Sequence, residues 1–238
     1  MTAGKKLKTA ADARDVTVEA GPVRLAGILS IPRKAPGIVL FAHGSGSSRL
    51  SPRNQYVAGV LQSRGVATLL FDLLTRDEET IDERTRALRF DIRLLANRLV
   101  GATRWVRQNA ETRGLPIGYF GASTGAGAAL VAAAELPEAV AAVVSRGGRP
   151  DLAGEALAAV RAPTLLIVGE YDEPVIEMNR EALERIGARD SKLVIVAGAT
   201  HLFEEPGTLE EAARLAAEWF EEHLAPTLRT REDQTVHR

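Results

Sequence analysis

The sequence predicts an α/β protein with a mostly parallel central sheet and helices on both of its faces. Short apolar runs alternate with longer helical patterns along most of the 238 residues. Several of these runs are apolar at every position, which is typical of strands that are buried on both faces. In such sheets ligands bind outside the carboxyl ends of the strands. The loops that follow the apolar runs are therefore the first place to look for a functional site.

The composition is that of one globular domain. Hydrophobic residues make up 45% of the chain and charged residues 26%. Lys and Arg number 30 against 31 Asp and Glu, so no overall basic field favours binding to nucleic acid or a membrane surface. Cysteine is absent, which excludes disulfides, thiolate metal sites and a cysteine nucleophile. We expect a cytoplasmic protein with a single domain over residues 1–225, loosely attached residues at 1–15 and a flexible tail at 226–238.

The first half of the chain contains a hairpin, two buried strands and a long helical pattern. Residues 16–18 and 25–31 flank the turn signal Gly21-Pro22, which indicates an antiparallel pair. The elements expected next are a strand at 37–42, a helix at 53–64, a strand at 66–71 and one helix from 81 to 108. We interpret the arginines of that last helix as a solvated face rather than a nucleic-acid patch; they are Arg84, Arg86, Arg93, Arg98, Arg104 and Arg107.

The second half continues the alternation of strands and helices. Strands are expected at 115–120, 139–145, 163–169 and 193–196. Helices are expected at 126–134, 154–160, 175–186 and 208–224. The most apolar stretch, at 126–145, is interrupted by Glu135, Pro137 and Glu138, and we do not expect it to span a membrane.

The strand that ends at Phe120 leads into Gly121-Ala122-Ser123-Thr124-Gly125. A strand, a Gly-x-Ser-x-Gly turn and a helix form the context of a nucleophile elbow, in which a sharp turn exposes the serine hydroxyl. Such a turn strains the serine backbone, and side chains at Gly121 or Gly125 would collide with the neighbouring strand or helix. Ser123 is therefore the candidate nucleophile, at a helix N-terminus that favours negative charge. By itself, the motif also fits a closely packed turn without chemistry.

A serine nucleophile needs a base that takes its proton and a third group that orients this base. In folds with this elbow the three residues follow the order Ser, Asp, His, and each lies in a loop after a strand. Of the four histidines, His201 is the one in such a loop after Ser123. Asp172 follows a buried strand and is the candidate orienting acid, with Glu170 and Glu173 as competitors.

The oxyanion of an acyl-transfer intermediate needs two backbone donors. We expect the N–H of Thr124 as the first donor, because this residue follows the nucleophile. The second is expected to be the N–H of Ser45, in the loop after the 37–42 strand, with the N–H of Gly44 as the alternative. His43 is interpreted as a brace of this loop. His43, Gly44 and Arg146 are candidate substrate contacts.

Arg146 and Arg149 follow the 139–145 strand and lie next to the predicted site. Two arginines there would suit the carboxylate or phosphate of a substrate. Alternatively they pair structurally with Asp151, Asp72 or Glu170. The sequence leaves both roles open.

Four motifs, in this order along the chain, resemble the α/β-hydrolase fold: His43-Gly44-Ser45-Gly46, Gly121-Ala122-Ser123-Thr124-Gly125, Gly169-Glu170-Tyr171-Asp172 and Ala199-Thr200-His201. The resemblance covers about residues 16–224, and the short chain is similar to the dienelactone-hydrolase-like branch. It implies hydrolysis of carboxylic esters or thioesters through an acyl-enzyme. Dienelactone hydrolases proper use a cysteine nucleophile, so this chain resembles a serine variant and lactone cleavage is not carried over. No long insertion follows the 139–145 strand, and no large cap domain is expected.

Two other functions fit parts of the sequence. Gly121, Gly125 and Gly127 match the glycine spacing of a short-chain reductase, but the Tyr-x-x-x-Lys pair of that family is missing. A hydrolase fold without hydrolysis would serve as a binding module. The sequence requires no cofactor or metal. We expect a small-molecule ester as the partner, neither nucleic acid nor membrane, and a monomer or homodimer.

Overall fold

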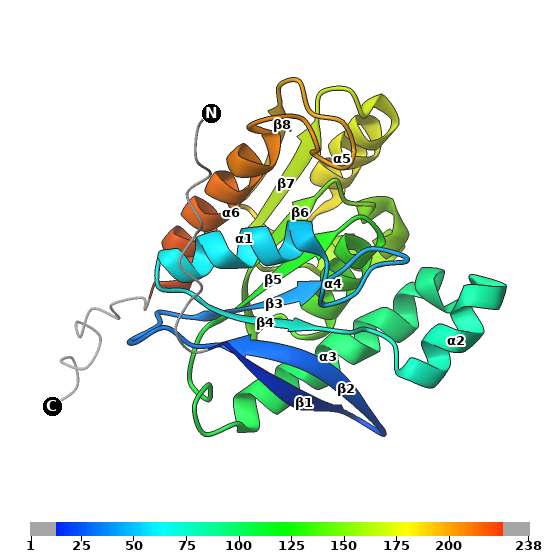
Figure 1. Ribbon diagram of the computed structural model, residues 1–238. Coiled ribbons are helices and arrows are strands. Elements are labelled where there is room, and N and C mark those ends of the chain that lie inside the picture. The colour runs from blue at the N-terminus through cyan, green and yellow to red at the C-terminus, as the bar shows by residue number, and fades with distance from the viewer. Residues whose placement is uncertain (1–12, 226–238) are drawn as a thin grey trace, which may run out of the picture.

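The computed structural model describes residues 13–225 and shows helices packed on both faces of a twisted sheet (Figure 1). The expected tail at 226–238 lies outside the described residues, as do residues 1–12 of the segment expected to be loosely attached. The first strand begins at Arg14, so the end of that segment belongs to the sheet.

The described residues form one eight-stranded sheet in the order β1-β2-β4-β3-β5-β6-β7-β8. β1 pairs antiparallel with β2, β2 pairs antiparallel with β4, and all other pairs are parallel. The predicted mostly parallel sheet is therefore confirmed. The strands are β1 (Arg14–Ala20), β2 (Val23–Ser30), β3 (Ile38–Ala42), β4 (Ala67–Phe71), β5 (Ile117–Ala122), β6 (Val140–Arg146), β7 (Thr164–Gly169) and β8 (Ser191–Val196).

Alternate side chains of the central strands pack into two separate cores. Along β3, Val39 and Phe41 join one core, while Ile38 and Leu40 join the other. The first core is covered by α1 (Pro52–Ser63) and α6 (Thr208–Leu224), which pack against each other in front of the sheet in Figure 1. The second is covered by α3 (Ile92–Gln108), α4 (Thr124–Glu135), α5 (Glu173–Arg185) and the 3-10 helix η2 (Pro150–Ala159). Because both faces are covered, the central strands are buried and mostly apolar, with Thr68, Ser145, Arg146 and Thr164 as buried polar exceptions.

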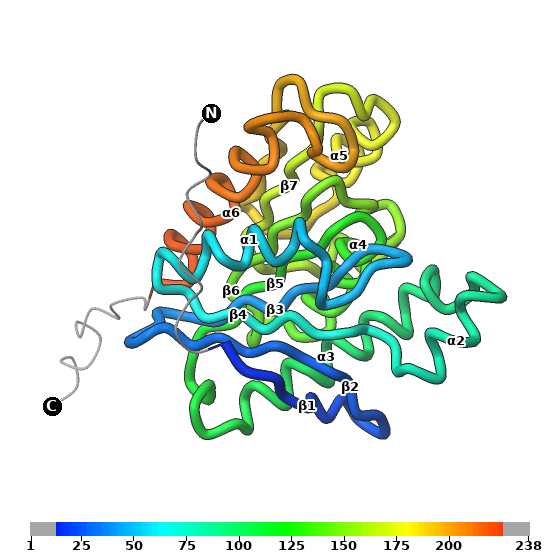
Figure 2. The backbone as a smooth tube through the Cα atoms, in the orientation of Figure 1, coloured from blue at the N-terminus to red at the C-terminus, as the bar shows by residue number. Residues whose placement is uncertain are grey.

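The single helix predicted over 81–108 is wrong. The structure has α2 (Arg76–Thr85), the short 3-10 helix η1 (Leu88–Phe90) and then α3. Arg86 takes a left-handed conformation with φ of 56°, which ends α2. The Asp91 carboxylate then accepts the N–H of Leu94 at 2.9 Å and caps a new helix. In Figure 2, α2 projects beyond the sheet at the right of the view.

The interpretation of the arginines as a solvated face is right for five of the six and wrong for Arg98. Arg98 is buried and pairs with Glu78 at 2.5 Å, so it fastens α3 to α2. The helix expected at 154–160 is the 3-10 helix η2, which begins at Pro150 and is kinked at Gly154. The remaining expected helices and strands are present and differ from the prediction only at their ends. Among residues 13–225, only η2 and its flanking loops separate β6 from β7, in agreement with the absence of a large cap.

Candidate functional site

Ser123 lies at a strained turn between β5 and α4. Its φ of 50° and ψ of −122° are unfavourable for a residue with a side chain. A side chain at Gly121 would collide with the backbone of Ala126, and one at Gly125 would collide with the Ala42 carbonyl of β3. The two glycines therefore allow α4 to start directly against the sheet. This is the local geometry that the Gly-x-Ser-x-Gly motif predicts.

Asp172 and His201 come from the loops after β7 and β8 and form a hydrogen bond. The His201 Nδ1 lies 2.6 Å from the Asp172 Oδ2. Because a carboxylate can only accept, Nδ1–H donates and Nε2 keeps its lone pair. Gly169 lets the two loops approach, since a side chain there would meet the Ala199 carbonyl.

The competing carboxylates take other positions. Glu170 accepts the N–H of Gly198 at 2.7 Å, which closes the loop after β8. Glu173 is the first residue of α5. The hydrogen bond to the His201 ring thus belongs to Asp172, which is the only one of the three acids with this contact among the described residues.

Ser123 and His201 line the same cavity of about 260 Å³, which we call the Ser123 cavity. Gly44 and Ser45 contribute part of its wall. A side chain at Gly44 would come within 3.2 Å of the Ser123 Cβ, so this loop backbone lies against the nucleophile. Thr124 is the first residue of α4, where backbone N–H groups have no partner within the helix. The predicted oxyanion residues thus lie next to Ser123 on two sides.

His43 holds the loop that contains Gly44. Its Nε2 accepts the N–H of Leu73 at 3.1 Å, and its Nδ1, 3.0 Å from the Gly44 oxygen, must then be the protonated nitrogen. Burial lowers the pKa of His43. The ring therefore connects the loop after β3 to the backbone after β4, in line with the structural role expected for it. It lines a neighbouring cavity of about 580 Å³, which also includes Gly44 and Ser45, rather than the Ser123 cavity.

The two arginines after β6 differ. Arg149 forms a bidentate pair with Asp151 at 2.8 and 2.7 Å, one of the structural pairs that the sequence left open. Arg146 lines the Ser123 cavity, is 7% exposed, and its Nε and Nη1 have no hydrogen-bond partner in the described part of the chain. Burial and the charge of Arg53 lower its pKa to about 10, so the guanidinium is charged at neutral pH.

Two residues near Arg146 were not predicted from the sequence as parts of the site. Arg53, at the start of α1, lines the Ser123 cavity and pairs with Glu204 at 3.0 Å. Phe203 is buried, has φ of 56°, and its ring centre lies 5.8 Å from the Arg146 guanidinium carbon. The left-handed backbone of Phe203, two residues after His201, could not be inferred from its residue type.

Comparisons with known proteins show the family and the fold of the chain. The model of the dienelactone hydrolase family matches residues 25–227. A crystal structure of a dienelactone hydrolase from Anabaena variabilis is 65% identical, with a TM-score of 0.88, over 89% of this chain and 98% of that one. Est1E from Butyrivibrio proteoclasticus has a TM-score of 0.73 at 16% identity over 88% of this chain and 98% of its own, and therefore shows the fold alone.

Two curated relatives from strains of Mycobacterium tuberculosis are named putative phosphoribosyl transferases. Each is 61% identical over 210 residues, which is 88% of this chain and 46% of the relative. The chain thus spans about half the length of these relatives. Among residues 13–225, no helix is both long and apolar enough to cross a membrane.

Proposed function

Because the chain belongs to the dienelactone hydrolase family, we propose that it is a serine hydrolase that cleaves carboxylic esters or thioesters of small molecules. Hydrolase chemistry is supported by the family. The finer assignment rests on one observation: the Asp172–His201 hydrogen bond lies beside a cavity that also contains Ser123, which is held at a strained turn. A carboxylate, an imidazole with one unprotonated nitrogen and an exposed hydroxyl are the parts that acyl transfer requires.

In this proposal His201 Nε2 takes the proton of the Ser123 hydroxyl as its oxygen attacks the ester carbonyl. Asp172 keeps Nδ1 protonated and stabilises the imidazolium as it forms. The intermediate collapses, His201 gives its proton to the leaving oxygen or sulfur, and the acyl group stays on Ser123. Water then repeats the sequence, with His201 again as base, and releases the acid.

The negative oxygen of the intermediate is held by backbone donors in the same proposal. The N–H of Thr124 belongs to the free first turn of α4, and the N–H of Ser45, with Gly44 as the alternative, belongs to the loop held by His43. Each donor of this kind typically contributes about 2.7–4 kcal/mol to the transition state. Since these donors are part of the backbone, their position depends on the loop and not on a side-chain rotamer.

Arg146 points to esters that carry an anionic group near the scissile bond. A charged guanidinium with unpaired buried nitrogens gains from a carboxylate or phosphate more than an exposed, already paired arginine does. We expect Arg146→Met to reduce kcat/KM for an ester with a terminal carboxylate at least about tenfold more than for a neutral ester of equal length. Equal losses for both esters would contradict this role.

The names of the relatives bear on the substrate in two ways. The Anabaena variabilis protein is named a dienelactone hydrolase, so lactones are one class of ester to include in a substrate panel. The mycobacterial relatives are named for phosphoribosyl transfer but are about twice as long as the matched segment. We do not propose that activity for this chain.

The decisive experiment is covalent labelling of the serine. Wild type and Ser123→Ala are incubated with a fluorophosphonate probe, and the mass shift and labelled peptide are determined while p-nitrophenyl acetate and butyrate turnover is followed. We expect stoichiometric labelling at Ser123, lost in the variant together with turnover. A folded wild type that stays unlabelled and inactive would refute the proposal and favour a binding module.

A further inference from the structure

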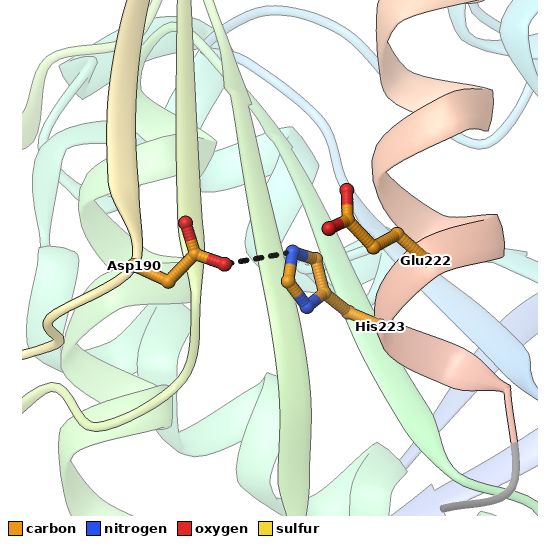
Figure 3. A group of neighbouring side chains, drawn as sticks. All are labelled: Asp190, Glu222 and His223. Carbon is orange, nitrogen blue, oxygen red and sulfur yellow. Dashed lines mark ion pairs between the residues drawn. The ribbon is translucent and has the colours of Figure 1, made fainter.

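We propose that Asp190, Glu222 and His223 bind one divalent transition-metal ion, for which Zn²⁺ is the probe (Figure 3). The three residues come from two segments that are distant in sequence. Asp190 directly precedes β8, and its carbonyl accepts the N–H of Thr164 at the start of β7. Glu222 and His223 lie in the last turn of α6. The cluster therefore lies at the amino ends of the parallel strands, whereas Ser123 lies at their carboxyl ends.

The spacing of the three side chains suits a shared ion. The Nε2 of His223 lies 3.4 Å from the Oδ2 of Asp190, and one ligand atom of each residue lies within 4.8 Å of the others. Two ligands of a tetrahedral ion with bonds of about 2.0–2.2 Å are themselves about 3.3–3.6 Å apart. The distance of 3.4 Å between His223 Nε2 and Asp190 Oδ2 falls within this range. Only the Glu222 carboxylate has to move closer, and it is exposed and able to rotate.

The His223 Nε2 faces the two carboxylates and lies within ion-pair distance of Asp190, but it forms no hydrogen bond with either of them. The His223 Nε2 is buried and makes no hydrogen bond to the residues that the structure describes, and the side chain is 12% exposed. The ring is held in place by an edge-on contact with Trp219, at 4.3 Å between ring centres. A buried imidazole nitrogen that makes no hydrogen bond costs free energy, which a bond to an ion would recover. This observation separates the cluster from an ordinary group of surface acids.

The ligand atoms of the three residues determine which metal ions the site favours. One imidazole nitrogen and two carboxylate oxygens suit Zn²⁺, Co²⁺ or Ni²⁺, whereas Ca²⁺ and Mg²⁺ require more oxygen ligands. Two carboxylates also balance the double charge of the ion. The Lys192 ammonium, a nearby positive charge, lies 4.9 Å from the centre of the Trp219 ring. The remaining coordination positions would hold water.

A bound ion would connect the end of α6 to the start of β8. Asp190 is more than thirty residues away in sequence from Glu222 and His223. The ion would therefore bind the folded form preferentially and stabilise it. The inference does not depend on the proposed hydrolysis, because the cluster shares no residue with the Ser123 cavity.

Two titrations of the metal-stripped full-length protein test the site. Zn²⁺ binding is measured by calorimetry, and Co²⁺ binding is followed by the visible absorption of the ion. We expect one site in the wild type and at least about tenfold weaker binding in the isosteric variants Asp190→Asn and Glu222→Gln, whose thermal midpoints no longer rise with Zn²⁺. Without Zn²⁺, both variants should have the circular dichroism spectrum and the thermal midpoint of the wild type, which shows that they fold. Since Asp172 and His201 form another carboxylate–imidazole pair, His201→Gln is the matched control and should retain the site. Absence of a stoichiometric site in the wild type, equal affinity in Asp190→Asn, or loss of the site in His201→Gln would overturn the proposal.

Discussion

Replacing Asp172 by Asn tests the proposed mechanism most sharply, because it removes a charge and keeps the shape of the side chain. The Asp172 oxygen lies 2.6 Å from His201 Nδ1. An amide can present its NH₂ group to the ring instead, which favours the tautomer with the proton on Nε2, where it cannot act as the base. The variant thus loses both the orientation of the base and the stabilisation of its cation.

The structure sets the size of the expected effect. Hydrogen bonds to charged groups contribute about 1.5–3 kcal/mol, and the wrong tautomer adds to this loss. The Asp172 side chain is 13% exposed and that of His201 is 38% exposed, so water reaches the ring and replaces part of the lost interaction. We therefore expect kcat/KM for p-nitrophenyl acetate to fall about 10²–10³-fold, which corresponds to about 2.7–4.1 kcal/mol of transition-state stabilisation.

The assay compares initial rates after subtraction of the Ser123→Ala rate, with Glu170→Gln as the matched control. Glu170 lies two residues from Asp172 and accepts a backbone N–H of the neighbouring loop, not the His201 ring. Its neutral variant should stay within about threefold of the wild type. An Asp172→Asn rate within that range, or an equally large loss in Glu170→Gln, would refute the assignment of the orienting acid.

Three further predictions concern stability. Gly125→Ala should destabilise the protein by about 3 kcal/mol in urea unfolding, because the new methyl group meets the Ala42 backbone carbonyl, which cannot move aside. Burial lowers the pKa of His43 in the folded protein below its value in the unfolded chain, which is about 6.5. As pH falls, His43 therefore binds a proton in the unfolded state first. The free energy of unfolding should decrease as pH falls below about 6.5, until His43 is also protonated in the folded state. Arg146→Met should raise the thermal midpoint, because it removes a buried charge whose Nε and Nη1 have no hydrogen-bond partner within residues 13–225.

Each of these has its own control. Gly59→Ala, in α1 with open space around the new methyl group, should stabilise the protein by up to about 1 kcal/mol. If it costs as much as Gly125→Ala, contact with the sheet is not the cause. The pH dependence should be weaker in His43→Gln, and an unchanged profile would assign it to other groups. A lower thermal midpoint in Arg146→Met would show that the guanidinium contributes stability, through Phe203 for example, which contradicts its assignment to ligand binding.

The sequence by itself determined most of the fold, because the signals involved are local. Runs of apolar residues show which strands are covered on both faces, and the order of strand and helix then favours a parallel sheet. The elbow at Ser123 is also a local property, since its glycines are required by atoms of the same turn and the adjacent strand. The candidate residues at the ends of β3, β5, β7 and β8 follow from the same reasoning, because parallel strands bring those ends to one edge.

Tertiary structure was needed wherever the outcome depends on contacts between distant segments. Glu170, Asp172 and Glu173 have the same functional group within four positions, and only the path of the β8 loop decides which of them meets His201. No glycine or proline marks the end of α2, and the break at Arg86 depends on a single left-handed residue.

The partners of charged side chains are decided in the same way. Arg146 and Arg149 are three residues apart. Arg149 pairs with Asp151, whereas Arg146 is buried and two of its guanidinium nitrogens have no hydrogen-bond partner among residues 13–225. The Asp190–Glu222–His223 cluster has no sequence motif, because β8 and α6 bring its members together only in the folded chain. Sequence patterns report which residues are buried and where strands end, whereas the pairing of charges depends on three-dimensional distances of a few ångströms.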